Sequence, residues 1–278
     1  MNIASGSREV KRFYDETGWR VRGGASVDHE LFGTTEDGPI RQELHRVHTE
    51  RIISALSRAG ESLNLLECGC GGNPEKMFLH LCREYTGVDF SDTGLDMARN
   101  SFAGAGVPHN FRAADVCALP FADGSFDAVY SAHMVYHIED TKAQSAALQE
   151  LVRVVRTGGI VVVVAANPRP LAFPFRFVKR LLADTPVVGP LLNRLRPKPP
   201  LPYQPMSIGW MRRRLGRASS VEVLGGGMPP TSFYRNVTEF NGVGRLFWRV
   251  IRWIDLGFPR ASAWLGNYVI LICTKTST

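Results

Sequence analysis

Short apolar runs alternate with helix-like patterns between residues 63 and 166. Four of the runs have the length of β-strands: Leu63–Cys68, Tyr85–Phe90, Phe126–Ser131 and Ile160–Ala165. The last run is continuously apolar, which is typical of a strand buried on both faces of a parallel sheet. Strands that alternate with helices indicate βαβ units, so we predict an α/β fold with a doubly wound, mostly parallel sheet.

Two helices are predicted around these strands. One covers Pro39–Ala59, and the other precedes the last apolar run. The second has apolar residues at positions i, i+3, i+4 and i+7: Leu148, Leu151, Val152 and Val155. We expect Thr141 to cap the start of this helix, and Gly158 and Gly159 to end it.

The pattern changes after Asn167. Ten of the 17 prolines lie between Pro168 and Pro205, and repeated proline cannot extend a long helix or a central strand. We therefore expect an insertion that lies over the sheet. Two more strands are predicted at Val221–Leu224 and Tyr268–Thr274, with a helix over Val243–Phe258 between them. One face of that helix is apolar: Leu246, Phe247, Val250, Ile251 and Ile254.

Composition excludes several classes of protein. With 278 residues, 44% of them apolar, the chain can bury a core without disulfides or metal ions. No run of 18 apolar residues exists, so we expect no membrane-spanning helix, and Met1–Arg12 lacks the apolar segment of a secretory signal. The five cysteines are odd in number and form no second zinc-like pair. We expect a reduced, cytoplasmic protein without a metal site.

Positive charge is concentrated in one segment. Residues 169–217 contain eleven lysines and arginines and a single acid, Asp184, whereas the rest of the chain is slightly acidic. Nucleic acid, an anionic membrane surface, an acidic substrate or plain solvent would each suit such a segment, so charge alone leaves these alternatives open.

A glycine-rich turn with acids around it carries the candidate chemistry. Residues 65–74 read LLECGCGGNP, an apolar strand followed by glycines, with Pro74 suited to the first turn of a following helix. Pro74 stands where a dinucleotide site has its third glycine, which argues against that site. Three acids, Glu67, Asp89 and Asp115, follow successive predicted strands or segments, where carboxylates accept hydrogen bonds from ribose hydroxyls or an adenine amine. Together they favour an adenosine that carries a positive charge.

The motifs occur in a characteristic order. They are LLECGCG at 65–71, GVDFS at 87–91, AADVCALPF at 113–121, SFDAVYSAH at 125–133 and LQELVRVVRTGGIVVV at 148–163. In this order they resemble class I S-adenosylmethionine (SAM)-dependent methyltransferases, similar to the ubiquinone/menaquinone-biosynthesis type and its small-molecule relatives. One departure is Asn73, where the family usually has a glycine.

The resemblance implies a fold and a division of the chain. The sheet would be Rossmann-like and seven-stranded, with an antiparallel last strand. Residues 1–60 would form an N-terminal helical lid, and residues 61–166 the SAM-binding core. Residues 167–218 would form a basic, proline-rich cap, and residues 219–278 would complete the sheet around a second insertion at 227–267.

The resemblance also implies which residues bind the cofactor. Glu67, Gly69, Cys70 and Gly71 would lie near the methionine half of SAM. The ribose and adenine would meet Asp89, Phe90, Asp115 and Val116. Ser131 and Ala132 would lie below the sulfonium. The product would be S-adenosylhomocysteine, and no metal is implied.

Three residues are candidates for catalysis. His133 and His137 follow the fourth strand at its carboxyl end, where ligands bind in open α/β sheets, and either would serve an acceptor that must lose a proton. Tyr14 lies in a segment that resembles the tyrosine-bearing lid of relatives. His45 and His48 lie three residues apart, but the sequence offers no convincing third metal ligand.

We expect the acceptor to be a largely apolar small molecule, such as a secondary metabolite, a quinone precursor or an isoprenoid, because the insertions are rich in aromatic residues and arginine. Alternatively, the basic insertions contact a membrane surface and the acceptor is a lipid or a lipid-linked glycan. An RNA methyltransferase or a non-catalytic SAM-binding subunit is a weaker alternative, and we expect no nucleic-acid partner. The chain would be a monomer or a homodimer.

Overall fold

The computed structural model describes residues 5–22, 25–26, 39–170, 201–216, 219–226 and 242–277. Most of the predicted cap at 167–218, and residues 227–241 of the second insertion, therefore lie outside the described residues. Within the described ranges, no helix is long and apolar enough to cross a membrane.

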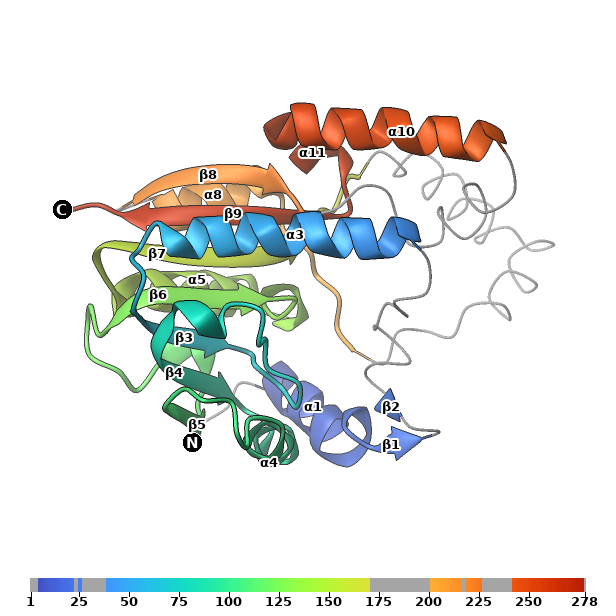
Figure 1. The fold of residues 1–278 in the computed structure, drawn as a ribbon. Helices are drawn as coiled ribbons and strands as arrows, with labels where there is room; N and C mark the ends of the chain where they lie inside the picture. Colours follow the sequence, from blue (N-terminus) through green and yellow to red (C-terminus); the bar gives the residue numbers. More distant parts are fainter. Residues whose placement is uncertain are drawn as a thin grey trace.

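A seven-stranded sheet forms the centre of the molecule, in the order β5-β4-β3-β6-β7-β9-β8 (Figure 1). The strands are β3 Leu63–Cys68, β4 Cys82–Asp89, β5 His109–Ala113, β6 Phe126–Ala132, β7 Val155–Ala166, β8 Ser219–Gly225 and β9 Tyr268–Lys275. All neighbouring pairs are parallel except those of β9, which runs antiparallel to both β7 and β8. The predicted fold class, with its antiparallel last strand, is confirmed.

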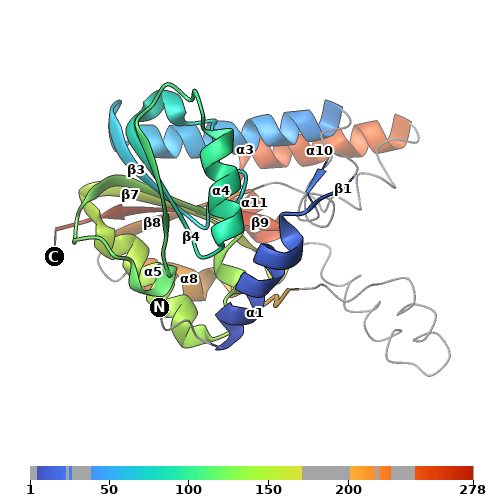
Figure 2. The same ribbon diagram turned by 90° about the horizontal axis from the view of Figure 1, so that it is seen from below.

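Helices cover both faces of the sheet (Figure 1, Figure 2). They are α1 Ser5–Phe13, α3 Pro39–Ser57, α4 Asp92–Ser101, α5 Thr141–Val154, α8 Ile208–Leu215, α10 Gly242–Gly257 and α11 Pro259–Leu265. Helices α3 and α4 share one apolar core with one face of the sheet, whereas α5 and α8 share a second core with the other face. A π-helical turn, Tyr14–Gly18, and a two-stranded ribbon, β1 Val21–Arg22 and β2 Ala25–Ser26, follow α1.

The boundaries of α5 differ from the prediction. The cap is Asp140 and not Thr141, because the Asp140 carboxylate accepts a hydrogen bond from the Ala143 N–H at 3.1 Å. The helix ends at Val154, and Val155 already pairs with Phe126 in the sheet. Gly158 and Gly159 therefore lie within β7 and do not end the helix.

The helix predicted after the glycine turn is absent. The chain from Gly71 to Phe78 forms turns, and the first helical residues are a short 3₁₀ turn, Leu79–Leu81. Two tertiary contacts hold the segment in this shape. The Glu75 N–H donates to the Glu67 carboxylate at 3.2 Å, and the fully buried Phe78 packs edge-on against Tyr130. With these anchors, the turn passes directly from β3 toward β4.

A buried ion pair attaches α10 to α3. Arg51 donates to the Asp255 carboxylate at 3.2 Å and to the carbonyls of Asp255 and Gly225, each at 2.6 Å. The side chains are only 12% and 6% exposed. The helix predicted at Val243–Phe258 is thus present as α10, but its predicted apolar face is only partly covered, since Ile251 is buried while Leu246 and Val250 are exposed.

Removal of the carboxylate of this pair should destabilise the protein. Asp255→Ala leaves the Arg51 guanidinium buried without its counter-ion, and we expect a loss of about 3 kcal/mol in the free energy of unfolding by urea denaturation. Glu222→Ala is the matched control, because its partners Arg58 and Arg260 are largely exposed, and it should cost no more than about 1 kcal/mol. Equal losses in the two variants would contradict the assignment.

Candidate functional site

The glycine turn after β3 is held against the end of β4. The N–H groups of Gly69 and Cys70 both donate to the Val88 carbonyl, at 2.8 and 3.2 Å. Gly69 and Gly71 have φ angles of 77° and 55°, which other residues rarely adopt. A side chain on Gly69 would also collide with Met134, because its Cβ would lie 2.7 Å from Met134 Cγ. The glycines therefore allow the turn to lie close to its neighbours.

Asp89 joins this turn to the next one. Its carboxylate accepts from the Gly71 N–H at 2.9 Å and from the Ser91 N–H at 2.8 Å. Burial raises the pKa of Asp89, while these hydrogen bonds oppose the shift by favouring the charged form. The carboxylate is thus fixed in position at the carboxyl end of β4.

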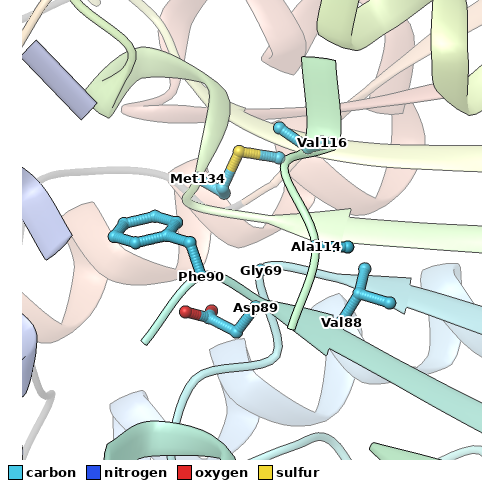
Figure 3. Close-up of a pocket in the computed structure, with 7 residues that line it drawn as sticks. All are labelled: Gly69, Val88, Asp89, Phe90, Ala114, Val116 and Met134. Carbon is cyan, nitrogen blue, oxygen red and sulfur yellow. The ribbon is translucent and has the colours of Figure 1, made fainter. Parts of the chain in front are cut away.

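A narrow cavity lies beside Asp89 (Figure 3). Its lining comes from the ends of adjacent strands and the turns after them: Gly69, Val88, Asp89, Phe90, Ala114, Val116 and Met134. Figure 3 shows the Phe90 ring between the Asp89 carboxylate and Met134. The free space is only about 20 Å³, so a flat heterocycle enters only when a lining side chain turns aside. An apolar slot with one carboxylate at its edge suits a nucleoside, with its ribose diol on the acid.

Seven predicted cofactor residues line this cavity or lie in the turns beside it. Gly69, Asp89, Phe90 and Val116 line it. Asp115 precedes the short helix Val116–Ala118, and its carboxylate accepts from the Cys117 N–H at 2.9 Å. Cys70 and Gly71 form the turn itself, and both of these residues are buried.

Glu67 has partners within the protein. Its buried carboxylate accepts from the Tyr85 hydroxyl and from the Glu75 N–H, and it is not among the residues that line the cavity. Burial raises the pKa of Glu67 to about 8, and the hydrogen bond from Tyr85 only partly offsets this. At neutral pH the side chain is therefore largely protonated. That Glu67 lies near a cationic ligand stays a prediction.

Ser131, Ala132 and His133 end β6 and begin the turn after it. Ser131 is fully buried, and its hydroxyl oxygen has no hydrogen-bond partner among the described residues. Ala132 is half-buried. His133 has a φ of 56°, the only positive value at a non-glycine residue in the described ranges, and its N–H donates to the Val164 carbonyl at 3.0 Å. A strained backbone of this kind is typical of functional sites.

His133 lies in a group of aromatic side chains. Its Nδ1 is 3.1 Å from the Tyr136 hydroxyl, and its ring meets the ring of Tyr268 edge-on at 4.7 Å. His133 is accessible to solvent. The many protein atoms around it, with His48 and His137 nearby, nevertheless lower the pKa of His133 to about 3. The ring is neutral at physiological pH.

The other two catalytic candidates are held by neighbouring segments. His137 Nδ1 donates to the Pro202 carbonyl at 2.7 Å, and burial lowers the pKa of His137. Tyr14 stacks on Trp19, with ring centroids 5.3 Å apart. Tyr14 is therefore connected to the glycine turn through Trp19, and the two histidines both follow β6.

Trp19 was not among the predicted site residues. A Cβ on Gly71 would lie 2.6 Å from its ring, and one on Gly72 would lie 2.9 Å from it, so the indole rests directly on the glycine turn. Its Nε1–H is buried and has no partner among the described residues. The segment is attached to α4, because Asp15 accepts from the Ser91 hydroxyl at 2.7 Å and Lys11 pairs with Asp92 at 2.9 Å.

His48 was also missed as a site residue. It lies on α3 and is close enough to His133 to contribute to the lowering of that residue's pKa. Burial lowers the pKa of His48 itself to about 4, and its Nδ1 has no partner among the described residues. In the sequence it stood out only as a possible metal ligand, three residues after His45. Nowhere in the described ranges do three His, Cys, Asp or Glu side chains gather as a metal site would require.

Comparison with known proteins identifies the domain. Residues 66–163 match the family model described as "Methyltransferase domain". The chain is 33% identical over 172 residues to 2-methyl-6-phytyl-1,4-hydroquinone methyltransferase of Synechocystis sp., covering 56% of this chain and 52% of that protein. It is 26% identical over 185 residues to ajmaline N-methyltransferase of Rauvolfia serpentina, covering 61% and 62%. The chain thus spans about half to three fifths of the length of these relatives.

The fold is shared with solved methyltransferases. Magnesium protoporphyrin IX methyltransferase from Synechocystis, solved with bound SAH, aligns over 97% of this chain and all of its own, with a TM-score of 0.59 and 15% identity. Together with the domain match, this confirms the resemblance to class I methyltransferases that the motifs indicated.

The protonation of Glu67 yields a test of the site's electrostatics. Its pKa is raised on folding, so the unfolded chain loses the proton near pH 4.5 whereas the folded protein keeps it to about pH 8. Stability should therefore fall as the pH rises between these values, and Glu67→Gln should remove this dependence. In urea denaturation we expect the stability of the wild type, relative to the variant, to drop by roughly 1–2 kcal/mol from pH 6 to pH 8.

Glu84→Gln is the control for this experiment, because Glu84 is exposed on β4, the strand that pairs with the strand of Glu67. It should leave the pH dependence of the wild type unchanged. If the Glu67→Gln and wild-type curves ran parallel, Glu67 would be ionised in the folded protein.

Proposed function

We propose that this chain, whose residues 66–163 form a methyltransferase domain, binds SAM beside Asp89 and transfers its methyl group to a largely apolar small molecule. The observation that carries the proposal is the fixed Asp89 carboxylate at the mouth of an apolar slot, next to a glycine turn. The product is S-adenosylhomocysteine. The proposal needs no metal ion.

Each part of the site has a defined role toward the cofactor. Asp89 accepts the ribose hydroxyls, Phe90 and Val116 enclose the adenine, and Asp115 faces the adenine edge. The turn of Gly69, Cys70 and Gly71, with Glu67 behind it, receives the methionine half. Ser131 and Ala132 form the floor below the sulfur. The orphaned hydroxyl of Ser131 and the small side chain of Ala132 support this placement.

SAM supplies a methyl group that is already activated on a sulfonium. The protein's task is then to hold the acceptor in line with the S–CH₃ bond and to exclude water, which contributes about 7–11 kcal/mol of barrier lowering in well-oriented reactions. The N-terminal segment serves as the lid, since Trp19 lies on the glycine turn and Tyr14 stacks on Trp19. We propose that residues 1–60 cover the core formed by residues 61–166.

The acceptor side is built around His133. Because its pKa is about 3, His133 is neutral and offers an imidazole nitrogen to a hydroxyl or amine of the acceptor. The rings of Tyr136 and Tyr268 provide an apolar wall. The names of the relatives support an apolar ring system as acceptor: a phytyl hydroquinone, the alkaloid ajmaline and a magnesium porphyrin. His137 positions the segment at Pro202, and its part in catalysis is secondary.

Asp89→Ala tests the cofactor site. Loss of two charge-assisted hydrogen bonds to the ribose should weaken SAM binding by about 100-fold in isothermal titration calorimetry, equivalent to about 3 kcal/mol. Asp96→Ala, an exposed carboxylate on α4, is the matched control and should bind as the wild type does. Circular dichroism checks that the variants are folded. Unchanged affinity in the folded Asp89→Ala variant would refute the proposed SAM site.

His133→Asn tests the acceptor side. Loss of the imidazole nitrogen that accepts a hydrogen bond from the acceptor should lower kcat by about tenfold, with SAM affinity within threefold of the wild type. The effect on kcat is no larger because a base with a pKa of about 3 takes up a proton poorly at neutral pH. The assay follows labelled methyl transfer from SAM to short-chain alkyl hydroquinones. Since His133 stays neutral down to about pH 3, it should cause no loss of activity between pH 7 and 5. His137→Asn should have a smaller effect on kcat. If the variant with both substitutions kept full turnover, neither histidine would assist catalysis, and the rate would depend only on how the acceptor is held next to SAM.

A further inference from the structure

Helix α10 carries an exposed apolar stripe. Leu246, Val250 and Trp253 lie at i, i+4 and i+7, on one line of the helix, and they are 60%, 48% and 65% exposed. Phe258, 52% exposed, extends the stripe, because its ring contacts that of Trp253 with centroids 5.5 Å apart. Four large apolar side chains in one continuous surface stripe indicate an interaction site.

The opposite side of α10 is firmly attached to the protein. Ile251 is buried, and Asp255 forms the buried pair with Arg51 of α3. Figure 1 and Figure 2 both show α10 beside α3, on the outside of the molecule. The orientation of the stripe is therefore defined by contacts on the other face of the helix, and the stripe faces away from the core.

The charges around the stripe are positive. Helices α10 and α11 contain four arginines, Arg245, Arg249, Arg252 and Arg260, and one acid, Asp255, which Arg51 neutralises. Arg252 pairs with Glu43 at 2.8 Å, whereas Arg249 is exposed and has no acidic partner among the described residues.

We infer that this face of α10 docks on the surface of an anionic lipid bilayer, with Leu246, Val250, Trp253 and Phe258 in the headgroup–acyl boundary and Arg249 on the phosphates. An apolar stripe with tryptophan, bordered by arginine on a helix whose one acid is buried, has the composition of an interfacial helix. A second copy of the chain fits less well, since a two-fold contact through the stripe would bring like-charged arginines together.

The position of α10 would bring the membrane surface close to the proposed acceptor side. In Figure 1, α10 extends past the carboxyl ends of the parallel strands, the edge of the sheet where His133 lies. A bilayer against α10 is therefore close to the proposed acceptor side, where an apolar acceptor dissolved in the membrane would enter. The docking itself does not depend on the proposed methyl transfer.

Vesicle co-sedimentation tests the inference. The whole protein should sediment with phosphatidylcholine vesicles that contain a quarter phosphatidylglycerol, and much less with phosphatidylcholine alone. Val250→Ser/Trp253→Ser should lower the bound fraction at least tenfold. Arg249→Glu should weaken binding to the anionic vesicles only. Arg112→Glu, at the far edge of the sheet on β5, is the matched control and should bind as the wild type does.

Three further measurements distinguish membrane docking from dimerisation and from failure of the cofactor site. Tryptophan emission should shift to the blue on addition of anionic vesicles, and this shift should be lost in Trp253→Ser. SAM affinity should be equal in all variants, so failure to dock is distinguishable from failure of the cofactor site. The inference is overturned if the wild type does not bind anionic vesicles, or if light scattering shows a dimer that the Val250→Ser/Trp253→Ser variant no longer forms.

Discussion

The Asp89 carboxylate is the contact on which the rest of the site depends. By accepting from the N–H groups of Gly71 and Ser91, it holds the turns after β3 and β4 at a fixed separation. Parallel strands place their carboxyl ends at one edge of a sheet, so these turns lie beside each other in any fold of this class. What is specific here is that a single buried acid positions both turns and still borders the cavity between them.

The N-terminal segment depends on the same two turns. Ser91 caps α4 and also donates its hydroxyl hydrogen to Asp15, while Trp19 packs on Gly71. The segment is therefore attached beside the cavity, whose lining comes from other residues. The residues around the glycine turn thus also hold this segment in place.

Helix α3 contacts the sheet, the surroundings of His133 and helix α10. Its residues Ile52 and Leu56 pack on the sheet, His48 reaches the neighbourhood of His133, and Arg51 holds α10. One helix face thus contributes to the core, to the acceptor side and to the attachment of the exposed apolar stripe. A shift of α3 would therefore move its contacts with the sheet, with the surroundings of His133 and with α10 together, because all of them come from neighbouring turns of the same helix.

Six of the seven strands, α5 and α10 could be predicted from the sequence, because apolar periodicity and short motifs depend on residues that are close along the chain. The short strand β5 and the contacts between distant residues emerge only in the folded protein. The tertiary structure replaced the expected helix after the glycine turn with turns anchored by Glu67 and Phe78, and it gave Glu67 a partner in Tyr85. It also placed His48 near His133 and paired Arg51 with Asp255, 204 residues away. Such pairings follow from how the layers pack, and no local pattern specifies which distant side chains will meet.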